Sequence, residues 1–471
     1  MPPAILWYRR DLRVHDLPAL AAALSDGADA GVVPVFCFDD ALLHGRFASA
    51  RRTWFLLQTL QALDARWHEL GGRVWWRRGN PAQELADVVR LTGATAVHAS
   101  EDFSAFARAR DERVARQLSD VGAELTLHPG VAISSDLGAL RTKAGKPHIV
   151  FTPFSKVWGA QERRELVKTP TQLHTPPGKR GALPSLEDLG FDPADAAVED
   201  PPQAGEVAGV AAAKSWSQQG LAEYEERRSD LAAVTSRLSA HLHYGSVSPL
   251  LVERMTLDQP GPGSQTYRSE LAWRDFYLQV LLQFPYVARQ EFQEKYRALS
   301  WEDDPEALER WKAGQTGYPV VDAAMRELAA TGFMHNRARM IVASFLTKDL
   351  HLNWREGERW FMQQLLDGDL ASNNGGWQWT ASTGTDPAPY FRRMFNPTLQ
   401  QQKFDTSGRY VRRWCPELAQ VPAKRLAEPW KMSPAEQRQA GCIIGTDYPE
   451  PMVDHAEERR HAVERYQAVS A

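Results

Sequence analysis

Three cysteines among 471 residues are too few for a framework of disulfide bonds. Cys37, Cys415 and Cys442 lie far apart and match no spacing known for metal ligands, so no metal site is predicted. Cysteine usage of this kind is typical of proteins from a reducing compartment, and we expect a cytoplasmic protein.

Long apolar runs are missing as well. No stretch approaches the roughly 20 apolar residues that a membrane-spanning helix requires. The first residues read Met-Pro-Pro-Ala-Ile-Leu-Trp and lead directly into a strand-like segment, without the basic region and apolar core of a secretory signal. We therefore expect no membrane partner.

Neither sign of charge dominates the chain. The 55 Lys and Arg residues nearly balance 59 Asp and Glu residues, for a net charge of -4, so a surface for nucleic acid must be local. Residues 392–431 carry nine Lys or Arg and only three Asp or Glu. This segment is either a stripe that binds a phosphate backbone or an ordinary solvated face.

Tryptophan, by contrast, is in excess. The chain has 16 tryptophans, although its 43% hydrophobic and 24% charged residues are ordinary for globular proteins. The flat indole ring suits stacking and electron transfer, but large helical cores also use it. At 471 residues the chain is long enough for more than one hydrophobic core.

Strands and helices alternate in the first 130 residues. Apolar runs predict strands at 4–8, 31–38, 73–76, 96–99 and 125–127, and amphipathic segments predict helices at 17–24, 49–70, 81–91 and 105–118. This alternation predicts a doubly wound parallel α/β sheet. Ligands of such sheets bind beyond the carboxyl ends of the strands, so we expect the loops after Phe38 and Ala99 to face a ligand. Neither loop has a glycine-rich phosphate motif, which argues against an ordinary dinucleotide-binding domain.

The character of the chain changes after a proline-rich connector. Seven prolines fall between residues 170 and 202, and helical periodicity dominates from about residue 206. Helices are expected at 207–226, 248–255, 267–283, 305–312, 319–331, 336–350 and 355–366. We therefore predict three parts: an α/β domain at 1–130, a connector at 131–205 and an all-helical domain at 206–471.

Residues 367–379 form the most unusual stretch. They read Asp-Gly-Asp-Leu-Ala-Ser-Asn-Asn-Gly-Gly-Trp-Gln-Trp and combine acids, adjacent asparagines, adjacent glycines and two tryptophans. One interpretation is the wall of a polar pocket, in which the acids accept hydrogen bonds, Asn373 donates and accepts, and the paired glycines allow a close ligand or a positive φ. The alternative is a helix N-terminus capped by Asp369 or Asn373, with Trp377 in the core.

A second polar segment lies at 234–239, where Val-Thr-Ser-Arg-Leu-Ser precedes a helical stretch. Backbone N–H groups, three hydroxyls and Arg237 at a helix N-terminus would suit a pyrophosphate. A simple helix cap is the alternative, although it explains only one hydroxyl.

A third set of polar side chains shares one face of a predicted helix. Glu270, Trp273, Arg274 and Tyr277 fall at i, i+3, i+4 and i+7. This face is either a recognition surface for a flat polar group or a surface stripe with a Glu270–Arg274 ion pair.

Two arginines precede the apolar run at 341–346. Arg337 and Arg339 follow the helix stop at Gly332. Because an unpaired charge beside a core is costly, we expect an anionic partner, and Asp367 is the candidate for Arg339.

Four motifs together resemble those of the photolyase/cryptochrome family. They are Thr-Ser-Arg-Leu-Ser at 235–239, Glu-Leu-Ala-Trp-Arg at 270–274, Met-His-Asn-Arg-Ala-Arg-Met at 334–340 and the stretch 367–379. The resemblance covers nearly the whole chain and is strongest to the class I cyclobutane pyrimidine dimer photolyases. It implies light-driven repair of these dimers in DNA, with FAD in the helical domain and a second, light-harvesting chromophore in the N-terminal domain.

The resemblance also implies which residues hold the flavin. The phosphates and ribitol would be held by Tyr224, Thr235, Ser236, Arg237, Leu238 and Ser239. The rest of the cofactor set is Arg274, Arg339, Asp367, Gly368, Asp369 and Asn373, with an Arg339–Asp367 salt bridge beside the ring and Asn373 facing flavin N5.

The residues that the resemblance implies for substrate binding overlap with those implied for the flavin. Glu270 would bind a pyrimidine carbonyl, Asn336 and Met340 would contact the dimer, and Trp273 and Trp379 would stack on the flipped bases. The same surface includes Tyr277, and the residues near the DNA backbone would be Arg228, Arg274, Arg337 and Gln400. Glu270 and Asn373 are the candidate catalytic residues, and Trp377, Trp354 and Trp301 would be the proximal, middle and surface steps of a chain that photoreduces the flavin.

Departures from family patterns narrow the subtype. Photolyases for the (6-4) lesion carry histidines in the segment that here reads Met-His-Asn-Arg-Ala-Arg, and many cryptochromes replace the residue at Asn373. Folate-binding relatives have an Asn-Glu pair before the Arg-x-Arg-Asp motif, where this chain has Phe106-Ala. A second chromophore of 8-hydroxy-5-deazaflavin or a flavin is therefore favoured over methenyltetrahydrofolate, unless the site is empty. It would lie near Phe36, Phe38, Asp39, Arg51, Asp102 and Phe106.

Two other functions stay open at this point. One is a cryptochrome-like FAD photoreceptor that signals through partners, although no long signalling tail follows Tyr466. The other is a structural helical protein with a tryptophan-rich core. We expect a monomer whose partner is DNA containing cyclobutane pyrimidine dimers.

Overall fold

A parallel sheet forms the N-terminal part of the computed structural model, which describes residues 2–386 and 389–469. Its strands are β1 (Ala4–Tyr8), β2 (Val32–Phe38), β3 (Trp75–Arg78), β4 (Ala96–Ser100) and β5 (Glu124–His128). They are hydrogen-bonded in the order β3-β2-β1-β4-β5, and every pair is parallel. All residues of β1 and β2 are buried, as expected for central strands covered on both faces. The predicted sheet is thereby confirmed.

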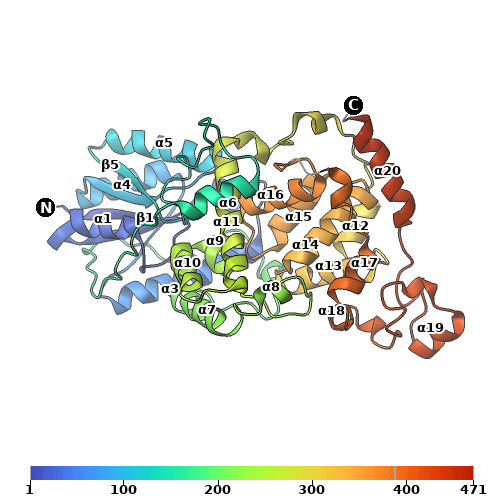
Figure 1. Cartoon of the computed structure of the whole chain (residues 1–471). Helices are drawn as coiled ribbons and strands as arrows, with labels where there is room; N and C mark the ends of the chain where they lie inside the picture. The colour runs from blue at the N-terminus through green and yellow to red at the C-terminus, as the bar shows by residue number, and fades with distance from the viewer. Residues whose placement is uncertain (1, 387–388, 470–471) are drawn as a thin grey trace.

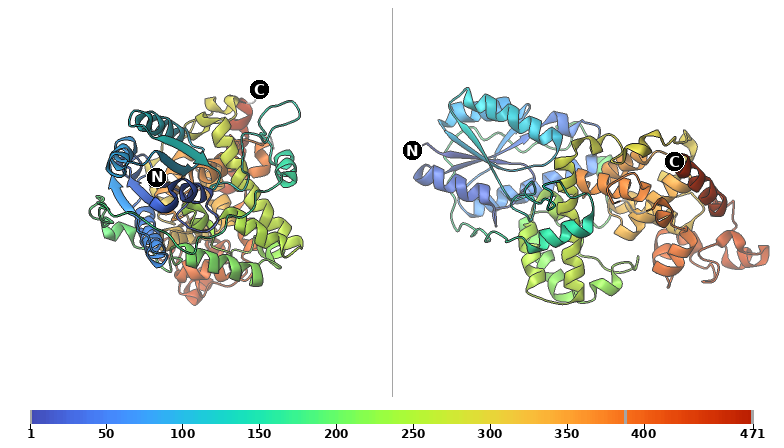
Figure 2. Two further views of the ribbon diagram at one scale, coloured as in Figure 1. Left: turned by 90° about the vertical axis from the view of Figure 1, so that its left-hand side faces the viewer. Right: turned by 45° about the horizontal axis from the view of Figure 1, so that its top comes forward.

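Helices cover both faces of this sheet (Figure 2). Ala4, Leu6 and Tyr8 of β1 share one hydrophobic cluster with α1 (Pro18–Gly27) and α3 (Ala50–Glu69). Ile5 and Trp7 point the other way, toward α4 (Pro81–Thr92) and α5 (Ala105–Ser119). Except for α1, these helices begin at side-chain caps, as at Ser104, whose side chain accepts a hydrogen bond from the Ala107 N–H. A single-turn helix, α2 (Asp40–Leu43), follows β2.

The connector contains one helix that the sequence did not predict. This helix, α6 (Phe151–Ala160), buries Phe154 and Trp158 against α11. It is short and lacks a side-chain cap, so it leaves little periodicity to detect. The proline-rich part that follows runs back along the sheet, where the carbonyls of His174 and Arg180 accept hydrogen bonds from the N–H groups of Val32 and Trp76. It ends in the 3₁₀ turn Pro193–Ala196.

The remainder is helical, as predicted, and contains only isolated β-bridges in its described residues. Its first helices are α7 (Glu206–Gln219), α8 (Tyr224–Arg227), α9 (Ser239–Tyr244), α10 (Pro249–Leu257) and α11 (Pro262–Gln283). The middle set is α12 (Pro305–Lys312), α13 (Pro319–Thr331), α14 (Asn336–Ser344), the π-helical turn Phe345–Asp349, α15 (Trp354–Gln364) and α16 (Leu370–Ala381). The last are α17 (Pro397–Phe404), α18 (Arg409–Trp414), α19 (Pro434–Ala440) and α20 (His455–Ala468). None of the helices described here is both long and apolar enough to cross a membrane.

Some predicted helix boundaries were wrong. The helix expected at 207–226 is two helices, because Gly220 ends α7. The helix expected at 336–350 changes to a π-helical turn after Ser344. Helix α11 starts five residues earlier than expected, at Pro262. The Gly-Pro-Gly sequence there resembles a loop, but Gly263 is needed because a Cβ would lie 1.9 Å from the Leu221 carbonyl oxygen.

The helices α11 and α16 pack together at the centre of the molecule, between the sheet and the outer helices (Figure 1). Helix α3 of the sheet layer also packs on α15. Helices α19 and α20 lie on the side of the molecule away from the sheet, with α19 farthest from it (Figure 1). The stretch that the sequence singled out therefore lies in the interior, next to both halves of the chain.

Candidate functional site

Residues 367–379 form the start and body of α16. Asp369 is the N-cap, and its Oδ1 accepts a hydrogen bond of 2.8 Å from the Ser372 N–H. Trp377 is 2% exposed and lies in the helical core. The cap-and-core interpretation is thus confirmed for these two residues. Neither Gly375 nor Gly376 has a positive φ, and Gly375 is needed because a Cβ would lie 2.1 Å from the Tyr277 ring.

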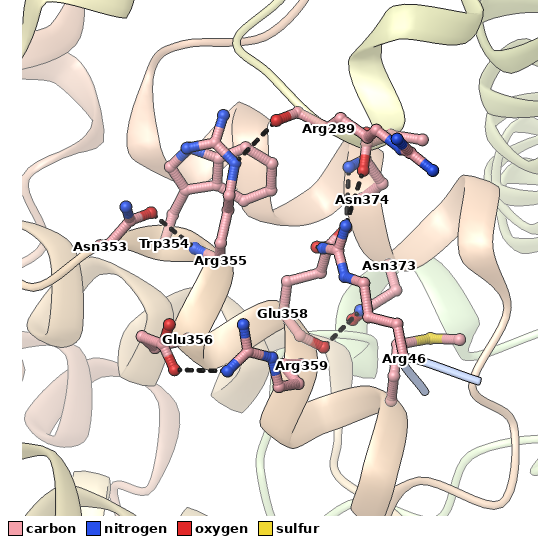
Figure 3. Close-up of polar contacts among 12 residues, drawn as sticks. Arg46, Arg289, Asn353, Trp354, Arg355, Glu356, Glu358, Arg359, Asn373 and Asn374 are labelled. Carbon is pink, nitrogen blue, oxygen red and sulfur yellow. Dashed lines mark hydrogen bonds and ion pairs between the residues drawn. The ribbon is translucent and has the colours of Figure 1, made fainter. Parts of the chain in front are cut away.

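Asn373 sits one turn into α16 and is held by a buried network (Figure 3). Its Nδ2 donates to the Glu358 carbonyl at 3.0 Å. Glu358 in turn accepts from Asn374 at 2.7 Å and pairs with Arg46 at 2.6 Å, while burial raises the pKa of its carboxyl. Among residues 2–386 and 389–469, no group donates a hydrogen bond to the Asn373 Oδ1. The network fixes the amide and leaves an acceptor free to face a ligand.

The predicted ion pair between Arg339 and Asp367 is present. Arg339 NH2 lies 2.8 Å from Asp367 Oδ2, and its Nε donates to the Met334 carbonyl at 2.8 Å. Asp367 is buried and, with Arg237 and Ser239, lines a small cavity. Gly368 separates this pair from the cap of α16.

Asp369 has a second role that the sequence did not indicate. Its Oδ2 lies 2.5 Å from Arg10 NH2 and 3.9 Å from His243 Nδ1, and Arg10 also lies 3.5 Å from Asp102. Burial alone would raise the pKa of Asp369, but Arg10 and His243 hold it well below its ordinary value. Both oxygens of Asp369 therefore contact protein groups, Oδ1 as the cap of α16 and Oδ2 beside Arg10, and its role in lining the cofactor stays a prediction.

This cluster fills the crevice where a doubly wound sheet ordinarily binds its ligand. The strand order places the topological switch between β1 and β4, so the relevant loops follow Tyr8 and Ser100. The expectation for the loop after Phe38 was wrong, because β2 does not border the switch. Arg9 occupies the crevice, donating to the Ser100 carbonyl and pairing with Asp111 at 2.5 Å.

The polar face of α11 divides into an outward and an inward part. Glu270 pairs with Arg228 at 2.7 Å, and the alternative Glu270–Arg274 pair is not formed. Burial raises the pKa of Glu270, and Arg228 opposes this effect. Arg274 turns inward and donates to the carbonyls of Val131 and Leu242 at 2.7 and 3.3 Å. Arg274 is therefore held mainly by backbone carbonyls, and its place near a DNA backbone stays a prediction.

Two tryptophans each have one face backed by the protein. Trp273 stacks on Phe151 with ring centroids 3.7 Å apart and planes within 6°. Trp379 lies under the Arg393 guanidinium, 4.2 Å from the ring centroid. Both side chains are only partly buried, and Tyr277 lies beside Trp273, with ring centroids 5.5 Å apart.

A cavity of about 410 Å³ adjoins this face. Its lining includes Tyr224, Thr235 and Ser236, together with Trp216 and Arg227, which the sequence did not single out. Within the described chain the buried Nε1 of Trp216 has no hydrogen-bond partner. The helix that follows, α9, has no side-chain cap bond. Hydroxyls, a cation and uncapped N–H groups suit the phosphates and ribitol of a flavin nucleotide.

The three tryptophans expected to carry electrons belong to one hydrophobic cluster. Trp377 and Trp354 are buried, and Trp301 is only partly buried. Gly357 of α15 brings the helix that carries Trp354 against Trp377, since a Cβ there would lie 2.0 Å from the Trp377 ring. A β-bridge between Glu302 and Leu352 brings the Trp301 segment beside the start of α15.

The remaining candidates lie at helix starts. Asn336 is exposed at the first position of α14, and Met340 is half-buried one turn later. Arg337 donates to the Ser229 hydroxyl at 3.2 Å and lies over Phe404. Gln400 is in α17, and its buried Oε1 has no partner among the described residues.

The basic segment 392–431 is mostly engaged within the protein. Arg393 pairs with Asp386 at 2.8 Å, Arg412 donates to the carbonyls of Ala419 and Val421, and Lys431 pairs with Glu428. These contacts favour the interpretation of a solvated, structural face over a continuous stripe for DNA.

Most of the residues predicted to lie near a second chromophore make contacts within the protein. Phe36 and Phe38 are buried in edge-to-face contact, and Asp39 caps α2. Arg51 donates to the carbonyls of Leu328 and Ala329. Asp102 pairs with Arg10, as described above. Only Phe106 of this set, 38% exposed, presents a free aromatic surface.

Comparisons with known proteins cover the whole chain. Residues 4–176 match the family model described as DNA photolyase, and residues 267–468 match the FAD binding domain of DNA photolyase. A curated deoxyribodipyrimidine photo-lyase from Streptomyces griseus is 41% identical over 98% of both chains. A class III photolyase from Agrobacterium tumefaciens superposes with a TM-score of 0.93 at 35% identity, covering 100% of this chain and 98% of the other. A cryptochrome from Synechocystis gives 0.89 at 30% identity, covering 98% and 99%.

Proposed function

Because the chain belongs to the photolyase/cryptochrome family, we propose that it is a deoxyribodipyrimidine photo-lyase that repairs cyclobutane pyrimidine dimers in DNA with blue or near-ultraviolet light. The observation that carries this function is the outward face of α11, where Glu270 pairs with Arg228, a residue that lines the cavity that suits a flavin nucleotide. Curated photo-lyases match over the full length of the chain, which supports the same conclusion.

The FAD-binding part of the chain fits FAD by its own geometry. Tyr224, Thr235 and Ser236 border the larger cavity, and Arg237, Ser239 and Asp367 border the smaller one. When bound, FAD supplies the light-excited electron that splits the dimer. The Arg339–Asp367 ion pair places one positive and one negative charge at fixed positions in this site. Asn373 presents a carbonyl oxygen that can accept a hydrogen bond from an N–H group of the flavin.

The substrate face would receive a dimer that has swung out of the double helix. Burial raises the pKa of Glu270, although Arg228 opposes this effect, and the carboxyl would donate a hydrogen bond to a pyrimidine carbonyl when it is protonated. Trp273 and Trp379 each offer one free face for stacking, which recovers part of the energy of unstacking the bases. Asn336 and Met340 complete the contacts to the dimer.

Phosphate contacts would come from the rim of this face. Burial and the nearby positive charge of Arg228 lower the pKa of Arg337, and an anion between the two arginines would relieve their repulsion. Gln400 of α17 would donate from its side-chain amide to a phosphate oxygen.

Trp377, Trp354 and Trp301 would carry electrons from the surface to the flavin. Their order follows burial, from the interior position of Trp377 to the partly exposed Trp301. Glu291 accepts a hydrogen bond from Trp354 Nε1 at 3.1 Å, so a carboxylate lies beside the middle step and favours a positive charge on it.

The finer assignments rest on sequence. Class I is proposed from the motif at 334–340 and from Asn373, although the similar Agrobacterium structure is named class III. An 8-hydroxy-5-deazaflavin or flavin antenna near Phe106 is proposed on the same ground. A monomer in a reducing cytoplasm agrees with three free, buried cysteines.

A photoreceptor of the cryptochrome type is the second candidate, because a cryptochrome superposes closely on the whole chain. Two measurements decide between them. An absorption spectrum of the purified protein reports the flavin and any antenna, and blue-light repair of a dimer-containing oligonucleotide reports the activity. A protein with flavin bands but no repair would be a photoreceptor.

The position of the substrate face is tested by changing Glu270 and Trp273 to Ala together. Repair falls strongly if the face is correct. The matched control is Glu225→Ala, because Glu225 is an exposed acid of the nearby helix α8 and is not among the residues that line the cavity. Full activity in the double variant would place the pocket elsewhere.

A further inference from the structure

Two imidazoles and a carboxylate meet beside the last helix, apart from the residues assigned to flavin and DNA. His351 Nε2 lies 2.8 Å from Glu458 Oε2, and His461 Nδ1 lies 3.2 Å from the same oxygen. The three candidate ligand atoms lie within 4.8 Å of one another, and a search of residues 2–386 and 389–469 finds no second such group. We propose that these side chains bind one divalent transition-metal ion, of which Zn²⁺ is the best fit.

The spacing of the three atoms is close to that of a tetrahedral site. Zinc bonds of about 2.0 to 2.1 Å place two tetrahedral ligands roughly 3.3 Å apart. The distances from Glu458 to the two histidines are 2.8 and 3.2 Å, so each distance has to increase only slightly to reach this spacing. A modest rotation of His461, whose side chain is 58% exposed, brings its imidazole to the same spacing from His351.

The donor set also matches zinc. Two imidazole nitrogens and one glutamate oxygen are ligands that Zn²⁺ takes in proteins, with water in the fourth position. His351 forms the buried inner side of the cluster, and His461 leaves the outer side open to a water ligand. Burial lowers the pKa of His351, which favours the neutral imidazole that binds metals.

The backbone holds His351 in an unusual way. The π-helical turn Phe345–Asp349 closes with a hydrogen bond from the Leu350 N–H to the Phe345 carbonyl, and His351 then adopts a φ of 55°. A left-handed conformation is uncommon for a residue other than glycine. Its carbonyl accepts from the Glu302 N–H at 2.9 Å, so the loop is held from both sides. This conformation turns the imidazole toward α20, where Glu458 and His461 are spaced i and i+3 on one face.

Contacts outside this cluster also hold α20 in place, so the proposed metal ligands can be changed without losing the fold. His455 and Asp349 form a separate pair at 2.5 Å across the same contact, and Arg465 lies 3.4 Å from Glu302. Removal of His461 therefore leaves α20 docked. A bound ion would add a further link between α20 and the loop that carries His351, without touching the repair site.

The test uses the full-length protein after chelator treatment. Zn²⁺ is titrated calorimetrically, and Co²⁺ is used as a spectroscopic probe, because a four-coordinate site gives strong visible absorption. We expect one ion per chain. His461→Ala and Glu458→Gln should each weaken the affinity by at least about tenfold, the scale on which single groups at metal sites act.

Two control variants match these changes. Glu457→Gln alters an exposed carboxylate one position away on α20, and His68→Ala removes an exposed histidine at the end of α3. Both should bind Zn²⁺ as the parent protein does, and far-UV circular dichroism checks that every variant is folded. Binding of less than one equivalent by the parent protein overturns the proposal. Unchanged binding by His461→Ala and Glu458→Gln overturns it equally.

Discussion

The ion pair between Arg10 and Asp369 joins the two halves of the chain, and its removal should weaken the fold by a predictable amount. Asp369 has two functions that two substitutions separate. Asp369→Asn keeps a cap residue for α16 but removes the charge, whereas Asp369→Ala removes both. Arg10 keeps Asp102 as a second partner, at 3.5 Å.

The magnitude follows from burial. Breaking a buried pair costs about 3 to 5 kcal/mol because one charge is left uncompensated, and the nearby Asp102 places Asp369→Asn at the lower end, about 3 kcal/mol. Loss of the cap should make Asp369→Ala less stable by a further ~1 kcal/mol. In the Arg10→Met background, Asp369→Asn should cost much less, because no cation is then left without its partner.

The pH dependence gives an independent check. Because the folded-state pKa of Asp369 is held below its ordinary value, its contribution is present above the unfolded pKa of about 4 and is lost as the pH falls through the folded pKa. The difference in the free energy of unfolding between the parent and Asp369→Asn should therefore be constant from neutral pH down to about pH 4 and shrink below it. Urea denaturation followed by tryptophan fluorescence measures this difference. A cost below about 1 kcal/mol at neutral pH would show that Arg10 and Asp369 are effectively solvated, and would refute the reasoning.

Three further predictions concern repair. Glu270→Ala should weaken binding of dimer-containing DNA by about tenfold or more, as expected for a lost hydrogen bond to a charged or polarised group, while Glu225→Ala should bind normally in the same gel-shift assay. Trp354→Phe should abolish most light-driven reduction of the oxidised flavin but leave repair intact after chemical reduction. It should also lower the free energy of unfolding by about 1 to 3 kcal/mol, because the hydrogen bond to Glu291 is lost. Normal photoreduction in this variant would exclude the route through Trp354. Phe151→Ala should weaken dimer binding by roughly 2- to 10-fold through loss of the stack on Trp273, with no change for undamaged DNA; equal weakening for both DNAs would contradict a role in dimer stacking.

The pattern of the sequence determined the elements and their order. Alternating apolar runs and amphipathic segments predicted every strand of the sheet within a few residues, and most clearly β1 and β2, because strands buried on both faces must be apolar throughout. The same holds for α12 and α13, whose boundaries matched the prediction. Motif resemblance indicated the flavin and the ion pair of Arg339 with Asp367, which lie only 28 residues apart.

Contacts between distant segments were decided by the tertiary structure. Arg10 and Asp369 are 359 residues apart, and no local pattern shows that an arginine after the first strand will reach the cap of α16. Glu358, Phe151 and Trp216 were missed for the same reason, since each is an ordinary residue of its own helix and gains its role only from what packs against it. Local periodicity records which side of an element is buried, and only the packing of the chain decides which partner lies there.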